Sequence, residues 1–191
     1  MVISIYNKKG GVGKTSLSFS LAKDLGYFLI SNDDSVIEQV YPNKSKIMRE
    51  PKLIENCVYD FGGFVDASAL KILNISDWVI IPLTSDLNSF KNTVSSLNEI
   101  ENKNIIFVAM RAEKSDFEEI ENYLKDKFHH KIFEIKESRI WSKTFVQKMS
   151  VSDIKNENKI NSYIYRNSID GYENLIKFIK KGITKWKRKT N

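Results

Sequence analysis

The sequence is poor in metal-binding side chains. It has a single cysteine, Cys57, which excludes an internal disulfide and a cluster held by cysteines of one chain. The apolar and aromatic neighbours of Cys57 predict a buried strand thiol. The two histidines, His129 and His130, are adjacent, so their side chains would point apart, and no third histidine supports them as a metal site. We therefore expect no metal centre built from cysteine or histidine.

Long apolar runs are also absent. No stretch reaches the roughly 18 residues that a membrane-spanning helix needs, and the chain turns to glycines and lysines by residue 7 without a signal-peptide pattern. We therefore expect a cytoplasmic protein. With 41% apolar and 28% charged residues, the composition is that of an ordinary globular protein. Its length fits a single domain over residues 1–191.

Acidic residues are missing from the C-terminal end. The net charge is +6, and seven basic residues with no acid follow residue 176, which leaves 23 basic and 24 acidic residues in the rest. We predict a basic helix or tail at about residues 168–191. Such an asymmetry indicates a polyanionic partner, nucleic acid or anionic lipid, or a merely solubilising end.

What recurs along the chain is an alternation of strand and helix patterns. Leu17, Leu21 and Leu25 repeat every fourth residue, and Gly26 supplies a helix stop. This alternation predicts an α/β fold with a doubly wound, mainly parallel sheet, helices on both faces, and ligands bound beyond the carboxyl ends of the strands. Uniformly apolar segments predict buried strands at residues 2–6, 27–31, 57–61, 78–82, 105–109 and 131–135.

The segment NKKGGVGKTS, residues 7–16, follows the first predicted strand. Its glycines let backbone N–H groups turn towards a phosphate, Lys14 can reach the β- and γ-phosphates, and Thr15 can offer a hydroxyl to Mg²⁺ at a helix N-terminus. The strict pattern G-x-x-x-x-G-K-[ST] would place glycine at Lys8, whereas the chain matches the variant K-G-G-x-G-K-[ST]. The predicted nucleotide-binding residues of this loop are Lys9, Gly10, Gly11, Val12, Gly13, Lys14, Thr15 and Ser16.

This loop resembles that of the deviant Walker A ATPases of the ParA/MinD family, most of all the small ParA-type partition proteins. LISNDD, at 29–34, falls where the family has a strand ending in D-x-D-P-Q, and CVYDFGG, at 57–63, falls where it has D-T-P-P. SDWVIIPLTSDLNSF, at 76–90, follows the family segment A-D-x-V and a proline. FVAMR, at 107–111, and the segment 135–151 complete a resemblance that spans about residues 1–151.

The resemblance implies a role for each charged residue of the site. Lys9 would reach across a homodimer to the partner's ATP, while Lys14 serves its own nucleotide. Asp60 would hold Mg²⁺ through water together with Thr15, and a carboxylate buried alone at a strand end would be costly, which favours the metal role. Asp33 would lie near the attacking water, although its segment also suits a solvated turn.

Several positions depart from the family pattern. Ser31 replaces the first carboxylate, residues 34–35 replace Pro-Gln, and 61–63 replace Thr-Pro-Pro in the segment that should sense the γ-phosphate. We therefore predict weak ATP hydrolysis that a partner or DNA accelerates. Met110 stands where relatives often carry an asparagine that reads adenine, so the choice of adenine rests on the resemblance; Arg111 is the further predicted nucleotide-binding residue.

Basic residues follow the last predicted strand. Lys136, Arg139 and Lys143 fall near the segment that ParA-like proteins use for sequence-independent DNA contact, where phosphate contacts give affinity without sequence information. A solvated helix face remains the alternative. Beyond them, an apolar stripe at helical spacing favours a core helix, with a MinD-like membrane helix or a DNA-contacting tail as alternatives; the stripe is Tyr172, Leu175, Ile176, Ile179, Ile183 and Trp186.

The resemblance as a whole implies an ATP-dependent DNA partition protein. In this interpretation a Mg²⁺-ATP sandwich homodimer binds nucleoid DNA non-specifically, and a ParB-type centromere-binding adaptor releases it by stimulating hydrolysis. The alternative is a MinD-like positioning ATPase, in which dimerisation doubles the avidity of two weak membrane anchors.

Overall fold

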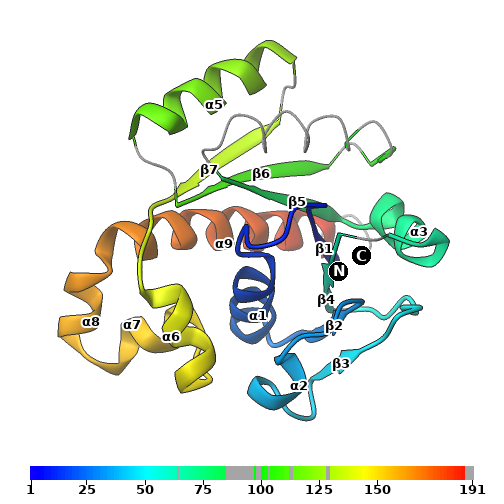
Figure 1. The fold of residues 1–191 in the computed structure, drawn as a ribbon, viewed down its shortest axis with the longest axis horizontal. Coiled ribbons are helices and arrows are strands. Elements are labelled where there is room, and N and C mark those ends of the chain that lie inside the picture. Colours follow the sequence, from blue (N-terminus) through cyan, green and yellow to red (C-terminus); the bar gives the residue numbers. More distant parts are fainter. Residues whose placement is uncertain are drawn as a thin grey trace.

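The computed structural model describes residues 1–63, 65–84, 97, 100–102, 104–111, 114–127 and 130–187. They form a seven-stranded sheet in the order β3-β2-β4-β1-β5-β6-β7 (Figure 1). Every described strand pair is parallel. The strands are β1 (Val2–Tyr6), β2 (Phe28–Ser31), β3 (Ser45–Ile47), β4 (Cys57–Phe61), β5 (Trp78–Leu83), β6 (Ile105–Met110) and β7 (Lys131–Ile135).

Helices cover both faces of this sheet (Figure 1). Ile3 and Ile5 of β1 pack on the face with α1, α6, α7 and α9, whereas Val2 and Tyr6 of the same strand pack on the face with α3 and α5. Successive side chains of a strand alternate between faces, so both sets must be apolar. The helices are α1 (Lys14–Leu25), α2 (Ile37–Val40), α3 (Ala67–Ile75), α5 (Lys114–Lys127), α6 (Ile140–Gln147), α7 (Val151–Glu157), α8 (Lys159–Ile164) and α9 (Arg166–Lys187).

The predicted fold class is confirmed, and the six predicted strands are found with ends shifted by at most one residue. Cys57 is a fully buried strand thiol, as predicted, and burial raises its pKa to about 12. The sequence interpretation missed β3, which has three residues and alternates between half-buried and exposed positions. So short and polar an edge strand lacks the apolar pattern by which the others were recognised.

The C-terminal helix α9 packs on the sheet. Tyr172, Leu175, Ile176 and Ile179 of the predicted stripe are all buried. The Tyr172 hydroxyl donates a hydrogen bond of 2.7 Å to the Asp24 carboxylate at the end of α1. This part of the stripe is therefore core, while the side chains of residues 183–187 lie outside the described ones. Within the described chain, no helix combines the length and apolarity needed to cross a bilayer.

Gly171 fixes how closely α9 approaches the sheet. A Cβ at this position would lie 2.2 Å from the Glu134 carbonyl oxygen of β7. The helix backbone therefore contacts the strand backbone directly, and a methyl group has no room between them.

We predict that Gly171→Ala destabilises the fold by at least about 2 kcal/mol, because the added methyl forces helix and strand apart. In an unobstructed helix the same change would stabilise by up to about 1 kcal/mol. Urea unfolding measures the difference. Asn174→Ala, at an exposed position of the same helix, is the matched control and should change stability by less than about 0.5 kcal/mol. A Gly171→Ala variant as stable as the parent would contradict this packing.

Candidate nucleotide-binding site

The glycine-rich loop joins the carboxyl end of β1 to the first turn of α1. Gly11 and Gly13 have φ values of 75° and 87°, a left-handed conformation that favours glycine. A Cβ on Gly13 would also lie only 3.1 Å from the Met110 side chain at the end of β6. Helix α1 has neither a side-chain cap nor an acidic residue in its first turn. Its first N–H groups therefore suit an anion.

Asn7 holds the start of the loop in place. Its side chain is 1% exposed, its Nδ2 donates to the Pro82 carbonyl oxygen of β5 at 2.6 Å, and its Oδ1 accepts from the backbone N–H of Lys9 at 2.8 Å. The loop is thus tied to the neighbouring strand three residues before its first glycine, Gly10. The sequence interpretation missed this residue, although an amide directly after an apolar strand was the available signal.

The charges of two carboxylates act on Lys14. Burial lowers the pKa of Lys14, and the charges of Asp60 and Asp33 act against that shift. The Lys14 Nζ donates to the Lys9 carbonyl oxygen at 2.7 Å. Asp33 comes from the segment after β2 and Asp60 from β4, so the parallel sheet brings three distant segments to one edge.

Asp60 is the buried charge of the site. Its side chain is 2% exposed, and burial raises its pKa to about 6 although Thr15, Lys14 and Ser18 all favour the ionised form. The Ser18 hydroxyl donates to its Oδ1 at 3.2 Å. The sequence analysis assigned no role to Ser18. Its hydroxyl reaches Asp60 only because α1 places Ser18 one helical turn after Lys14.

The residues present fit a magnesium ion. Mg²⁺ prefers oxygen ligands, is usually held by one or two protein groups, and completes its shell with water and substrate phosphates. The Thr15 hydroxyl would be such a ligand and the Asp60 carboxylate would hold a water of the shell, and a cation would supply the countercharge that the buried carboxylate lacks. In the described ranges no three histidine, cysteine or acidic side chains form a metal site by themselves, so the phosphates would have to contribute ligands.

Gly62 and Gly63, which replace two prolines of the family pattern, allow three loops to meet. A Cβ on Gly62 would lie 2.7 Å from the Asp33 Oδ2, and one on Gly63 would lie 2.8 Å from the Lys8 carbonyl oxygen. The Gly62 N–H donates to the Asn32 Oδ1 at 2.7 Å. The departure at this segment therefore has a packing reason that the sequence does not reveal.

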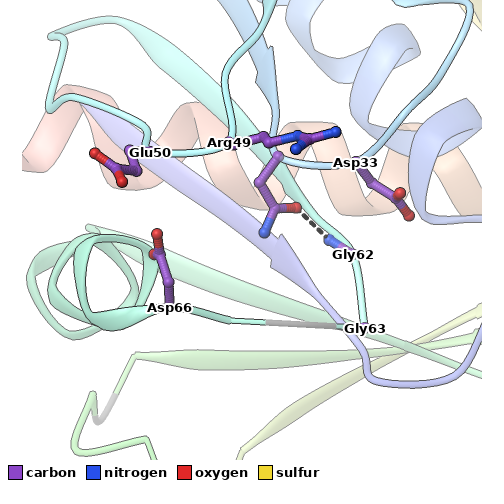
Figure 2. A pocket seen from close by; sticks show the side chains of 7 residues that line it. Asp33, Arg49, Glu50, Gly62, Gly63 and Asp66 are labelled. Carbon is purple, nitrogen blue, oxygen red and sulfur yellow. Dashed lines mark hydrogen bonds between the residues drawn. The ribbon is translucent and has the colours of Figure 1, made fainter.

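Two cavities lie at this edge of the sheet. The first, of about 470 Å³, is shown in Figure 2 and is lined by Asn32, Asp33, Arg49, Glu50, Gly62, Gly63 and Asp66. The second, also of about 470 Å³, lies at the ends of β6 and β7 and is lined by Arg111, Glu137, Ser138, Arg139, Trp141 and Ser142.

The second cavity is lined both by a residue predicted to bind nucleotide, Arg111, and by one predicted to bind DNA, Arg139. Arg111 directly follows Met110, whose side chain faces Gly13 of the glycine-rich loop. The Arg111 N–H donates to the Ile135 carbonyl oxygen at 2.8 Å. Arg139, predicted to bind DNA, lines the same cavity and is exposed, as is Lys136. Lys143 instead places its Nζ 5.0 Å from the centre of the Tyr165 ring, a cation–π contact that a phosphate would have to compete with.

An all-parallel sheet with a glycine-rich loop between β1 and α1, and a buried aspartate on the adjacent strand, defines the chain as a P-loop NTPase-like α/β protein. No family model and no curated protein matches the sequence. Solved structures do match, over nearly the whole chain. A variant of McdA from Cyanothece in complex with ATP is 13% identical, with 96% of both chains covered and a TM-score of 0.66.

Two further matches extend this comparison. A putative plasmid partition protein of Borrelia burgdorferi B31, bound to AMPPNP, is 19% identical, covers 94% of this chain and 98% of its own, and has a TM-score of 0.63. The septum site-determining protein MinD of Pyrococcus horikoshii OT3, with Mg-ADP, is 14% identical, with 95% and 98% covered and a TM-score of 0.57. The chain has the fold of the ParA/MinD proteins, as the resemblance predicts.

The raised pKa of Asp60 has a consequence for stability. Below about pH 4 the Asp60 carboxyl is protonated in the folded and unfolded states alike, so its burial as an anion does not lower the free energy of unfolding. Between that pH and its folded pKa of about 6, the folded state holds the proton more tightly, and stability falls as the pH rises. Above pH 6 the protein carries the full cost of a buried carboxylate.

We predict that Asp60→Asn stabilises the nucleotide-free protein by about 1–3 kcal/mol at pH 8, and by clearly less at pH 4.5. Asparagine keeps the shape and can still accept the Ser18 hydrogen bond. Urea unfolding at the two pH values measures both changes. Asp34→Asn, at an exposed position nearby, should leave stability unchanged at both. A loss of stability in the Asp60→Asn variant at pH 8, or an equal gain at both pH values, would contradict a raised pKa of the buried Asp60 carboxyl.

Proposed function

We propose that this protein is a Mg²⁺-dependent ATPase whose ATP-bound form is a homodimer. The observation that carries the proposal is Lys14, on which the charges of Asp60 and Asp33 act, at the start of a helix without a side-chain cap, which suits a phosphate chain with a cation. The matched structures hold ATP, AMPPNP or Mg-ADP, which supports an adenine nucleotide as the substrate. The cavity beside Arg111 is then the place for the base.

Each residue of the site has a part in phosphoryl transfer, which needs charge neutralisation and a positioned water more than covalent chemistry. The loop N–H groups and Lys14 would bind the β- and γ-phosphates, and Mg²⁺, held by Thr15 and Asp60, would neutralise charge between them. Asp33 accepts the Asp34 N–H at 2.9 Å through Oδ1, while its Oδ2 faces Gly62. From there it would orient the attacking water. With no second carboxylate at Ser31, we expect slow hydrolysis.

Lys9 would act in the neighbouring subunit. Its backbone is fixed twice, because its N–H bonds to Asn7 and its carbonyl accepts from Lys14. Its side chain is exposed. A fixed backbone that carries an exposed side chain suits a lysine that must contact the partner's phosphates. The Lys8 carbonyl oxygen instead lies against Gly63.

We predict that MgATP doubles the mass of the parent protein in light scattering, and that Lys9→Ala abolishes the doubling while ATP binding survives. Lys8→Ala removes an equal charge one residue away and should dimerise like the parent. Equal dimerisation of the Lys9→Ala variant, or equal loss in both variants, would refute the specific role of Lys9.

DNA partition is the finer function that we propose for this ATPase. The dimer would bind nucleoid DNA non-specifically through Lys136, Arg139 and Lys143, and a ParB-type centromere-binding adaptor would release it by stimulating hydrolysis. The exposed positions of Lys136 and Arg139 support this proposal. A membrane-positioning role is the alternative, since a MinD protein shares the fold. It is disfavoured because the stripe of α9 is buried as far as Ile179.

Reversing two charges separates these possibilities. We predict that plasmid DNA cosediments with the parent protein in the presence of MgATP, and that Arg139→Glu with Lys143→Glu reduces the salt dependence of log K by about 2. Lys46→Glu with Lys71→Glu, a matched change at exposed positions elsewhere, should keep the parent slope. An unchanged slope in the first variant contradicts the DNA site. Cosedimentation with anionic liposomes instead of DNA would favour the positioning role.

A further inference from the structure

Arg49 is a charged residue of the site edge that neither the motifs nor the proposed mechanism uses. It follows β3, whose last residue, Ile47, pairs with Ser31 of β2. The Met48 N–H donates to the Ser31 carbonyl oxygen at 2.8 Å, and Pro51 is buried. The backbone at Arg49 is therefore held on both sides, at the same sheet edge that carries the glycine-rich loop.

The Arg49 side chain lies in the first cavity. Figure 2 shows it extending towards the Asp33 segment, and Gly62 and Gly63 line the same cavity. Gly63 in turn lies against the Lys8 carbonyl oxygen, so this cavity borders the start of the glycine-rich loop. The second cavity lies on the other side, towards β6 and β7. If the base occupies the second cavity, the terminal phosphate faces the first.

The acidic residues that line this cavity are Asp33, Glu50 and Asp66, and among the residues described none of them forms an ion pair with Arg49. Asp66 accepts hydrogen bonds from the Ala69 N–H and the Ser68 hydroxyl as the cap of α3. Asp33 Oδ1 accepts the Asp34 N–H. In the part of the chain that the structure describes, the exposed guanidinium of Arg49 makes no hydrogen bond or ion pair with them. The cavity thus presents a cation available to a ligand.

The charge balance points to a phosphate as that ligand. Two carboxylates, Asp60 and Asp33, already act on the ammonium of Lys14, so a guanidinium of the same chain would add positive charge at the third phosphate beside the Mg²⁺ and the partner's Lys9 of the proposed mechanism. A guanidinium binds phosphate oxygens through two parallel N–H donors, which makes it more selective than a lysine. Phe61, Gly62 and Gly63 offer no charged or hydroxyl side chain for this purpose.

We propose that Arg49 binds the terminal phosphate of a nucleoside triphosphate held by the glycine-rich loop of the same chain, and so makes the site prefer triphosphate over diphosphate. This inference rests on the proposed nucleotide-binding function and deepens it. It assigns to the segment after β3 the recognition of the γ-phosphate, for which the altered segment after β4 has no side chain.

The test compares fluorescent mant-AMPPNP with mant-ADP, both with Mg²⁺, by direct titration. Arg49→Ala should weaken AMPPNP binding by at least about tenfold, the loss expected for a charge-assisted hydrogen-bond pair, and change ADP binding less than about twofold. The Arg49→Lys variant should have an AMPPNP affinity between those of the parent and of Arg49→Ala, because it keeps the charge but not the paired donors. Lys52→Ala, an exposed cation three residues away, is the control and should bind both nucleotides like the parent.

The outcomes distinguish a failure of the Arg49 inference from a failure of the proposed nucleotide-binding function. Retained ADP binding shows that the Arg49→Ala protein is folded. If that variant binds AMPPNP within twofold of the parent, the inference is wrong while the nucleotide site stands. An equal loss of both nucleotides also overturns it, because the residue then has a general structural role. If the parent protein binds neither nucleotide, the proposed function fails and this inference fails with it.

Discussion

The site depends on one electrostatic arrangement, the buried Asp60 carboxylate beside the Lys14 ammonium. Asp60 is paired with Ile5 of β1 on one side and Ser31 of β2 on the other, so the centre of the sheet fixes its position. Burying a carboxylate is costly unless it is paired and hydrogen-bonded. Lys14, Thr15 and Ser18 supply partners, yet the pKa remains raised to about 6. The nucleotide-free site therefore lacks positive charge that a bound cation would provide.

Close backbone contacts place the other loops around this arrangement. Gly13 meets Met110, Gly62 meets Asp33, and Gly63 meets Lys8, each at a separation that leaves little or no space for a side chain. Asn7 adds a hydrogen bond that ties the glycine-rich loop to β5, and Asn32 accepts one that ties the segment after β2 to the segment after β4. The site is thus assembled from close contacts of glycine backbones and from side-chain amide hydrogen bonds between five strand ends, which a single substitution at a glycine would disturb.

The fold was predictable because its signals are local. Strands covered on both faces are apolar at most positions, and the loop glycines with Lys14 and Thr15 stand in the order that a phosphate site requires. Residues whose role depends on contacts between segments distant in the sequence were not predictable. Arg49 follows a strand too short to show a pattern, and the need for Gly63 appears only when Lys8 is placed against it.

The same reasoning explains which predictions stay open. Asp33, Asp60 and Lys14 were predicted from a motif and do meet at one edge, but their roles towards a nucleotide stay predictions. Lys143 illustrates the limit of charge patterns, because its ammonium lies over the Tyr165 ring. A lysine count could not reveal that contact.

The most direct measurement of the central claim is the gain in ATP affinity that Mg²⁺ provides, taken by calorimetric titration at pH 8 and pH 5.5 with and without EDTA. If the Asp60 carboxylate completes its charge balance through the cation, Mg²⁺ should strengthen ATP binding at least about tenfold at pH 8. The gain should shrink at pH 5.5, below the folded pKa of about 6. The Asp60→Asn variant, which cannot ionise at this position, should show a smaller pH dependence, limited to the protonation of the terminal phosphate of ATP. An affinity for ATP that does not depend on Mg²⁺ at pH 8, or a gain that behaves alike in both proteins, would contradict the account.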